Sequence, residues 1–171
     1  DFTAQDVVFT WKRALTEGSD QKVRGSKIKN IEVIDDHTII IETPAPNPIL
    51  TADLIYIYIM DKEWAEANNA TEATSASADN TNNYANLNAN GTGPFKIIDH
   101  KADIKTTYER HGGYWKKIDS NVTKVEFTPI KEAATRVAAL ISGELDLVYP
   151  VPVQDWKRLD EAKGVKALAG P

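Results

Sequence analysis

The first residues of the chain combine a helix-start signal with apolar positions at helical spacing. Thr3 is suited to cap a helix, and Asp6 three residues later can complete a capping box with it. The apolar residues that follow recur at the period of one helix face: Val7, Val8, Trp11, Ala14 and Leu15. The pattern predicts a helix that begins after Thr3 and is ended by Gly18.

Over residues 28–43 the apolar positions change to alternation. Isoleucine and valine alternate with polar residues on both sides of the triplet Asp35-Asp36-His37. Aspartate favours tight turns because its side chain hydrogen-bonds to the nearby backbone. The segment therefore predicts a β-hairpin that turns at the aspartate pair.

Three prolines within residues 44–48 end this strand pattern, because proline has no amide hydrogen for a sheet. Asn47 followed by a proline predicts the cap of a short helix over residues 49–54. Asp61 predicts the cap of a further short helix that runs through Ala67.

Residues 68–90 differ in composition from the rest of the chain. They include eight asparagines with many alanines, threonines and serines, and their only large apolar side chains are Tyr84 and Leu87. Because so little of this stretch can be buried, we expect a mobile loop or linker that divides the chain.

The second half has a pattern of its own. Its first predicted elements are a turn at 91–94 and strands over 95–99, 104–110 and 122–130. A helix over 132–142, ended by Gly143, and a short strand over 145–148 are predicted next. The last predicted elements are a helix that begins at Pro152 and is ended by Gly164, and a strand over 165–168. In the first helix, one face carries Ala133, Ala134, Val137, Ala138 and Ile141; in the second, Val153, Trp156 and Leu159 are predicted to face inward. Helices mixed with strands indicate an α/β (mixed α+β) fold.

Length and composition narrow the classes of protein. The 171 residues correspond to one large domain or two small ones, and a hydrophobic share of 42% excludes global disorder. A pI near 5.2 argues against a protein whose main task is to bind nucleic acid. The chain has no cysteine, which excludes disulfide scaffolds, thiol catalysis and cysteine-based zinc sites.

Sequence signals of catalysis or metal binding are missing. The three histidines, His37, His100 and His111, lie in predicted turns or at strand ends, and no metalloprotease or serine-hydrolase motif occurs. Gly91-Thr92-Gly93-Pro94 lacks the lysine of a phosphate-binding loop and is interpreted first as a structural turn. Core packing is the simplest role for the four tryptophans, Trp11, Trp64, Trp115 and Trp156.

Several short motifs taken together resemble a known family. Residues 2–13 resemble a signature stretch of the extracellular solute-binding proteins, family 5, of peptide ABC transporters. Further motifs follow in the order of that family: Ile31-Glu32-Val33, Asp35-Asp36-His37-Thr38, Pro46-Asn47-Pro48, Asn90-Gly91-Thr92-Gly93-Pro94-Phe95, Tyr114-Trp115, Val125-Glu126-Phe127-Thr128-Pro129-Ile130 and Gly143-Glu144-Leu145-Asp146.

The resemblance implies a fragment of the first lobe of a type II periplasmic-binding-protein fold, with the second lobe absent. Residues 1–85 would form an outer subdomain that ends in the linker 68–90, and residues 86–171 an inner sheet subdomain forming one wall of a ligand cleft. It also implies a periplasmic or lipoprotein-anchored location, permease subunits of an ABC transporter as partners, no nucleic acid, no cofactor and a monomer when full length.

Candidate ligand-binding residues lie in two places. Tyr149, Pro150 and Val151 follow the predicted strand 145–148, at the strand end where α/β sheets place ligands, and the resemblance also implies a ligand-facing loop there. Tyr149 offers a ring and a hydroxyl, although core packing is an alternative role for it. Gly91, Thr92 and Gly93 form the second group of candidates.

The expected function is therefore capture of an oligopeptide or dipeptide-like ligand for an ABC importer, without chemistry on the ligand. A stand-alone interaction domain of the same descent would instead show a closed, polar surface where the second lobe should dock. A hydrolase would need clustered ionisable groups with shifted pKa values in a cleft. The ligand remains open, with peptide as the family default and nickel chelates, glutathione and sugars as alternatives.

Overall fold

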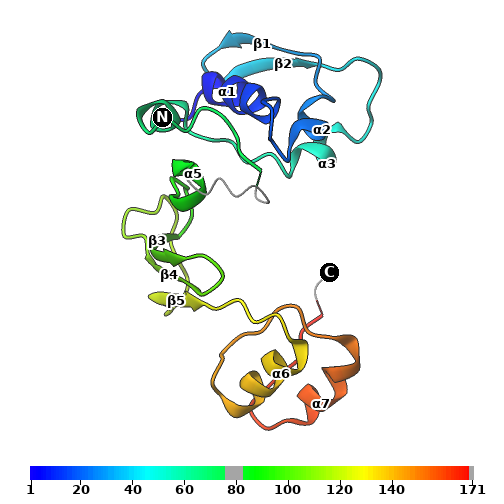
Figure 1. Ribbon diagram of the computed structural model, residues 1–171, viewed down its shortest axis with the longest axis vertical. Helices are drawn as coiled ribbons and strands as arrows, with labels where there is room; N and C mark the ends of the chain where they lie inside the picture. The colour runs from blue at the N-terminus through cyan, green and yellow to red at the C-terminus, as the bar shows by residue number, and fades with distance from the viewer. Residues whose placement is uncertain (76–82, 170–171) are drawn as a thin grey trace. The chain divides into compact units, whose positions relative to one another are not determined.

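The computed structural model describes residues 1–75 and 83–169 (Figure 1). The chain forms two compact units: unit 1 comprises residues 1–100 and 108–125, and unit 2 comprises residues 101–107 and 126–171. These units divide the chain at other residues than the predicted division after residue 85. The assignment of outer and inner subdomains of a lobe stays a prediction.

Helix α1 (Ala4–Ala14) begins where the sequence predicts. The Asp6 carboxylate accepts a hydrogen bond from the Thr3 amide at 2.8 Å, and the Thr3 side chain caps the first turn in return, which completes the predicted capping box. The helix ends at Ala14, before Gly18, whose φ of +84° is a left-handed conformation that favours glycine.

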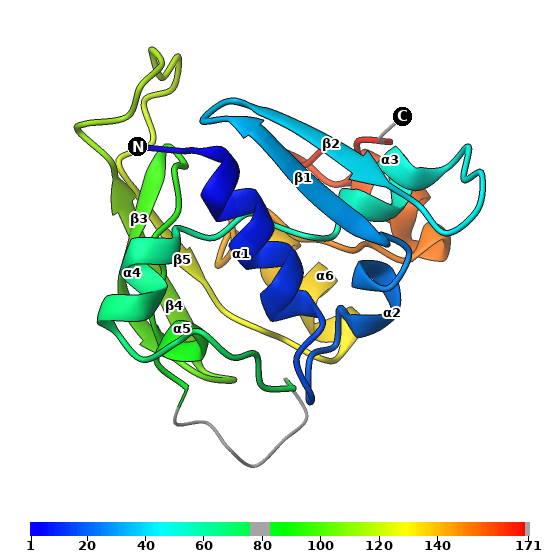
Figure 2. The same cartoon turned by 90° about the horizontal axis from the view of Figure 1, so that it is seen from above.

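Strands β1 (Asn30–Asp35) and β2 (Thr38–Glu42) confirm the predicted hairpin and pair antiparallel. The Asp35 carboxylate accepts from the His37 amide at 2.8 Å, and this bond lowers the pKa of Asp35. Helix α1 packs against β1, and the Ala4 amide donates to the Asp36 carbonyl at 2.7 Å (Figure 2). The predicted helix and the predicted hairpin are thus packed against each other within unit 1.

The remaining helices of unit 1 are short: α2 (Lys22–Gly25), α3 (Leu50–Leu54), α4 (Lys62–Ala67) and α5 (Tyr84–Leu87). Asp61 caps α4 as predicted, accepting from the Trp64 amide at 2.8 Å. The predicted cap of α3 is wrong: Ile49 occupies the cap position. Asn47, two residues earlier, accepts from the Ile49 amide at 3.1 Å.

Two buried polar side chains of α1 hold the segment that leads into α4. Asp6 accepts from the Lys62 amide at 2.9 Å, and Thr10 accepts from the Met60 amide at 2.9 Å. Burial raises the pKa of Asp6, but its hydrogen bonds from the Lys62 and Thr3 amides lower it by more, so its pKa lies below the ordinary value. With Arg13 these residues form what we call the polar stripe of α1: Asp6, Thr10 and Arg13.

The start of the predicted linker 68–90 is attached to α1 by the third residue of the polar stripe. Arg13 donates to the carbonyls of Ala70 and Glu72, each at 3.0 Å, and Ala70 is fully buried. Residues 76–82 of the predicted linker lie outside the described residues, and its mobility stays a prediction. Helix α5, which the sequence did not predict, places Tyr84 5.6 Å from Trp64 between ring centroids.

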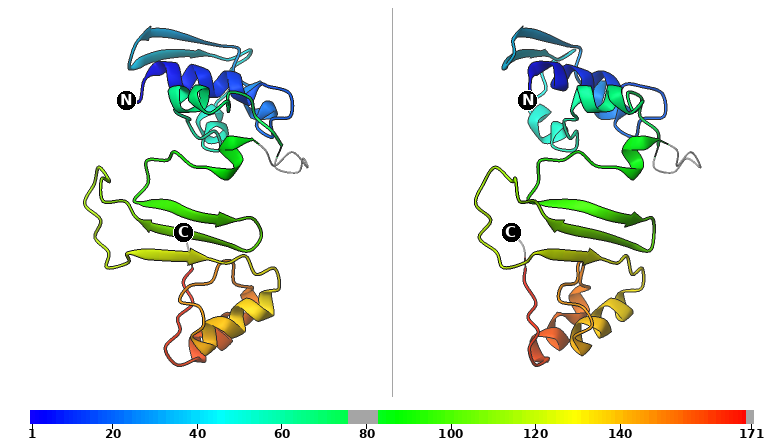
Figure 3. Two further views of the ribbon diagram at one scale, coloured as in Figure 1. Left: turned by 60° about the vertical axis from the view of Figure 1, so that its left-hand side comes forward. Right: turned by 90° about the vertical axis from the view of Figure 1, so that its left-hand side faces the viewer.

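A second sheet has the strand order β3-β4-β5, with β3 (Phe95–Lys101), β4 (Lys105–Arg110) and β5 (Lys124–Phe127), as Figure 3 shows. All three strands were predicted. Arg110 is the last residue of β4, and its Nε donates to the Val122 carbonyl at 3.1 Å. This bond holds the loop that leads to β5.

Helix α6 (Ala133–Ser142) ends as predicted at Gly143, whose φ is +79°. Glu132, predicted as the first residue of the helix, is its N-cap. The predicted inward face is partly wrong. Val137 and Ala139 are buried, whereas Ala134 and Ala138 are exposed. Because small alanine side chains lie on several sides of this helix, its faces differ little in hydrophobicity, and packing decides which side is covered.

A 3₁₀ turn, η1 (Val153–Asp155), leads into α7 (Trp156–Glu161). Leu159 is 1% exposed and Trp156 is half-buried, in agreement with the predicted inward face, but Val153 is 78% exposed and does not belong to it. The predicted strands over 145–148 and 165–168 are absent; both segments are irregular in the described chain. A strand needs a hydrogen-bonded neighbour, and neither segment has one among the described strands.

The tryptophans differ in burial. The Trp11 indole donates to the Gly25 carbonyl at 3.1 Å, which joins α1 to α2. The predicted core position of Trp115 is wrong: this ring is 70% exposed, and the Lys116 ammonium lies 4.2 Å from its centroid. Among the described helices, none has the length and apolar character needed to cross a membrane.

Candidate ligand pocket

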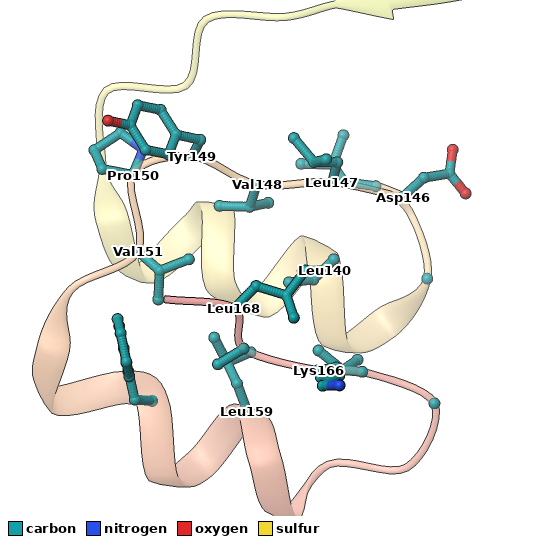
Figure 4. Close-up of a pocket in the computed structure, with 16 residues that line it drawn as sticks. Leu140, Asp146, Leu147, Val148, Tyr149, Pro150, Val151, Leu159, Lys166 and Leu168 are labelled. Carbon is teal, nitrogen blue, oxygen red and sulfur yellow. The ribbon is translucent and has the colours of Figure 1, made fainter. Parts of the chain in front are cut away.

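Unit 2 contains an open pocket of about 660 Å³ (Figure 4). Leu140 of α6 and both Trp156 and Leu159 of α7 form its helical walls. Gly143 and the irregular segments 145–151 and 164–168 supply the remaining lining. The segments that were predicted to be strands are thus the loops that complete the pocket.

Most of the lining is apolar. Figure 4 shows Val151 and Leu159 pointing into the space between the two helices, with Leu140 and Leu168 beside them. The lining side chains that carry a hydroxyl or a charge are Asp146, Tyr149 and Lys166. Such an arrangement suits an apolar group whose polar ends are bound at the rim.

Tyr149, the principal candidate from the sequence, lies at the outer edge of this pocket. Its side chain is 87% exposed, and in Figure 4 its ring lies beside Pro150 and points away from the apolar lining. Core packing of Tyr149, the alternative interpretation, is therefore excluded within unit 2. Pro150 and Val151 also line the pocket, and the Tyr149–Pro150 peptide bond is cis.

Hydrogen bonds attach each of the two pocket loops to a helix. The amides of Glu144 and Leu145 donate to the Ala139 carbonyl at 2.9 and 3.2 Å, which ties the start of the first loop to α6. The Asp160 carboxylate accepts from the Ala167 amide at 3.2 Å and ties the second loop to α7. The pocket walls are thus joined to the two helices that the sequence predicted.

The second group of candidates lies in unit 1 and contributes nothing to the pocket lining. Gly91 and Thr92 are exposed and Gly93 is half-buried. The Pro94 carbonyl accepts from the His111 amide at 2.8 Å, which anchors the turn next to the end of β4. Their role as ligand-binding residues stays a prediction.

Arg136 is the residue near the pocket that sequence reasoning missed. Its guanidinium donates to the Pro150 carbonyl at 3.2 Å, directly beside Tyr149. A signal existed, because Arg136 is the only charged residue within the span Ala133–Ser142 of α6. A single charge in an otherwise apolar or small-residue helix suggests a specific partner.

Comparison with known proteins gives relatives over the whole chain. Heme-binding protein A of Haemophilus influenzae is 28% identical over 98% of this chain and 32% of the relative. The dipeptide-binding protein of Escherichia coli is 27% identical over 100% of this chain and 33% of the relative. The chain therefore spans about a third of the length of these relatives.

Solved structures show the same fold. The periplasmic binding protein DppA from Helicobacter pylori, in complex with the peptide STSA, matches 95% of this chain and 33% of its own, with a TM-score of 0.74 and 24% identity. The dipeptide binding protein from Pseudoalteromonas, in complex with Met-Leu, matches 95% of this chain and 33% of its own, with a TM-score of 0.73 and 20% identity. The mixed helix and sheet architecture is that of type II periplasmic binding proteins.

The family described as bacterial extracellular solute-binding proteins, family 5 Middle, matches residues 1–171. That span is the whole chain, and it includes every motif on which the resemblance was based. Its relatives are binding proteins rather than enzymes. The chain belongs to the family 5 bacterial extracellular solute-binding proteins.

Proposed function

We propose that this chain is part of the substrate-binding component of an ABC importer, which captures oligopeptide or dipeptide-like ligands and delivers them to the permease without changing them. The observation that carries the proposal is the family match over residues 1–171. Peptide is the proposed ligand class because a relative that is 27% identical over the whole chain is a dipeptide-binding protein. The location would be the periplasm or, with a lipid anchor, the outer face of the cytoplasmic membrane.

In this proposal the loop 148–151 contributes one wall of the ligand site. Tyr149 offers an exposed ring and hydroxyl, and the apolar pocket behind it offers a surface for a side chain of the ligand. An extended peptide is held mainly through its backbone, which permits a range of side chains. Charged groups that bind peptide termini are expected in the part of the protein beyond this chain.

The 171-residue chain alone is expected to bind peptide poorly, because one wall leaves the far side of the ligand hydrated. Isothermal calorimetry with Met-Leu, Ser-Thr-Ser-Ala and a mixed dipeptide pool measures this, with the complete polypeptide as the reference. The complete polypeptide should bind at least one probe. Submicromolar binding by the 171 residues alone would contradict a site shared between two lobes.

In the complete polypeptide, Tyr149→Ala is expected to weaken binding of the same probes by about five- to a hundredfold, the range for an aromatic contact worth about 1–3 kcal/mol. The unfolding midpoint should hardly change, because the side chain is 87% exposed. Tyr58→Ala, another exposed tyrosine at 82% that lies outside the pocket lining, is the matched control and should leave binding unchanged. Unchanged affinity for Tyr149→Ala would remove Tyr149 from the site.

A further inference from the structure

One guanidinium joins the entry of α6 to the rim of the pocket. Nη1 of Arg136 donates to the carbonyls of Ile130 and Lys131 at 2.7 and 2.9 Å. Nη2 of the same side chain donates to the Pro150 carbonyl at 3.2 Å. Two segments that are distant in sequence are thus connected by three hydrogen bonds from one residue.

The surroundings of Arg136 indicate that it serves these carbonyls and no other group. Its Nε is buried and has no hydrogen-bond partner among the described residues, and no carboxylate of residues 1–75 or 83–169 forms an ion pair with it. A buried donor without a partner costs free energy. The two terminal nitrogens, aimed at carbonyl oxygens, are therefore what fixes the guanidinium in place.

Arginine suits this position for a geometric reason. Its planar guanidinium carries donors in a fixed fork and stays charged, so Nη1 and Nη2 can bind acceptors that lie in different directions. A lysine ammonium at the end of a flexible stem carries its donors on one atom and cannot reach both segments in the same way. The fork is needed because Ile130 and Pro150 belong to different loops.

We propose that Arg136 is a positioning residue that orders the rim loop 148–151 and thereby presents Tyr149 at the edge of the pocket. Because the Pro150 carbonyl is held, the backbone that carries Tyr149 has fewer conformations to lose when a ligand binds. The effect of Arg136 on affinity rests on the proposed function. Its effect on the order of the loop does not.

The order of the loop is tested first, on the 171-residue chain, by ¹⁵N relaxation. In Arg136→Met, the order parameters of the amides of Tyr149 and Val151 should fall from about 0.85 toward 0.6 or below, while those of α1 stay unchanged. Arg136→Lys keeps the charge and the stem, is the variant to use should Arg136→Met not fold, and should give an intermediate value. Unchanged order parameters in either folded variant would overturn the proposal.

Arg110→Met is a matched control for loss of an arginine held by carbonyls. Arg110 donates to the carbonyls of Val122 and Ser120 in unit 1, so its replacement should loosen residues 120–123 and leave the amides of Tyr149 and Val151 ordered. Loss of order at Tyr149 in Arg110→Met as well would show a general effect of destabilisation, which contradicts a specific role for Arg136.

A double-mutant cycle in the complete polypeptide distinguishes positioning from direct contact. With Ser-Thr-Ser-Ala and Met-Leu as probes, Arg136→Met should weaken binding about five- to tenfold when Tyr149 is present and less than twofold in the Tyr149→Ala background. Equal losses in both backgrounds would overturn action through Tyr149. Absence of peptide binding by the unaltered protein would instead contradict the proposed function, and the order parameters would still decide the role of Arg136.

Discussion

Replacement of Asp6 by alanine is expected to lower the free energy of unfolding of unit 1 by about 2–4 kcal/mol. The variant loses the capping box with Thr3, which accounts for about 1 kcal/mol. It also leaves the Lys62 amide without the acceptor that lies 2.9 Å away, and a partly buried donor without a partner costs about 1–3 kcal/mol. Urea unfolding followed by the NMR signals of α1 and the β1–β2 hairpin measures the loss.

Gln5→Ala provides the control for this variant, because Gln5 is exposed on the same helix. A surface substitution of this kind should change the free energy of unfolding by less than about 0.5 kcal/mol. Equal destabilisation by Gln5→Ala and Asp6→Ala would contradict the role assigned to the carboxylate.

The contribution of the Asp6 carboxylate to stability should depend on pH, and the variant Asp6→Asn tests this. The pKa of Asp6 is lowered in the folded protein, so its stabilising contribution is fully present above the unfolded pKa of about 3.9 and is lost as the pH falls through the lower folded pKa. The difference in unfolding free energy between the unaltered protein and Asp6→Asn should therefore be largest at pH 5–7 and shrink below about pH 4. A difference that stays constant from pH 7 to pH 2 would show that charge is not involved.

Leu159→Ala is expected to destabilise unit 2 by about 2–5 kcal/mol, the range for a large apolar side chain removed from a core. Leu159 is 1% exposed and points into the space between α6 and α7, so its removal leaves part of that space unfilled and enlarges the pocket that it lines. Hydrogen exchange of the amides of α6 and α7 measures the local free energy of opening. Exchange in α1, which belongs to unit 1, should not change.

Leu147→Ala removes the same number of atoms from the same pocket lining, but at a position that is 80% exposed. It should change the opening free energy by less than about 0.5 kcal/mol. Similar losses for Leu147→Ala and Leu159→Ala would mean that the packing of unit 2 does not depend on Leu159.

Features that depend on a few neighbouring residues were predictable from the sequence. The capping box of Thr3 and Asp6, the turn after Asp35 and the stop at Gly143 are each determined within one turn of chain, and all three are confirmed. The segments 145–148 and 165–168 failed as strands because a strand is defined by a partner that local sequence does not contain. The prediction that Ala134 and Ala138 face inward was wrong, because packing, not periodicity, decides which side of α6 is covered.

The same distinction applies to the candidate site. Tyr149 was proposed because it follows a predicted strand and because the resemblance implies a ligand-facing loop there. That strand is absent, and the ligand role of Tyr149 stays a prediction. Leu159 was predicted to face inward because α7 has a regular apolar period. Arg136 was missed, because its role depends on where the carbonyls of Ile130 and Pro150 come to lie, and no local pattern reports that.

The polar stripe of α1 also makes tolerance to substitution asymmetric. Asp6, Thr10 and Arg13 bind backbone amides and carbonyls, not the side chains of their partners. Any residue at position 72 supplies the same carbonyl, and any residue except proline at position 62 supplies the same amide. In a saturation mutagenesis scan, Lys62 and Glu72 should therefore accept most replacements, while the polar stripe that binds their backbone should accept few. Sequences in this part of the fold can thus diverge on one side of a contact while the other side stays constrained.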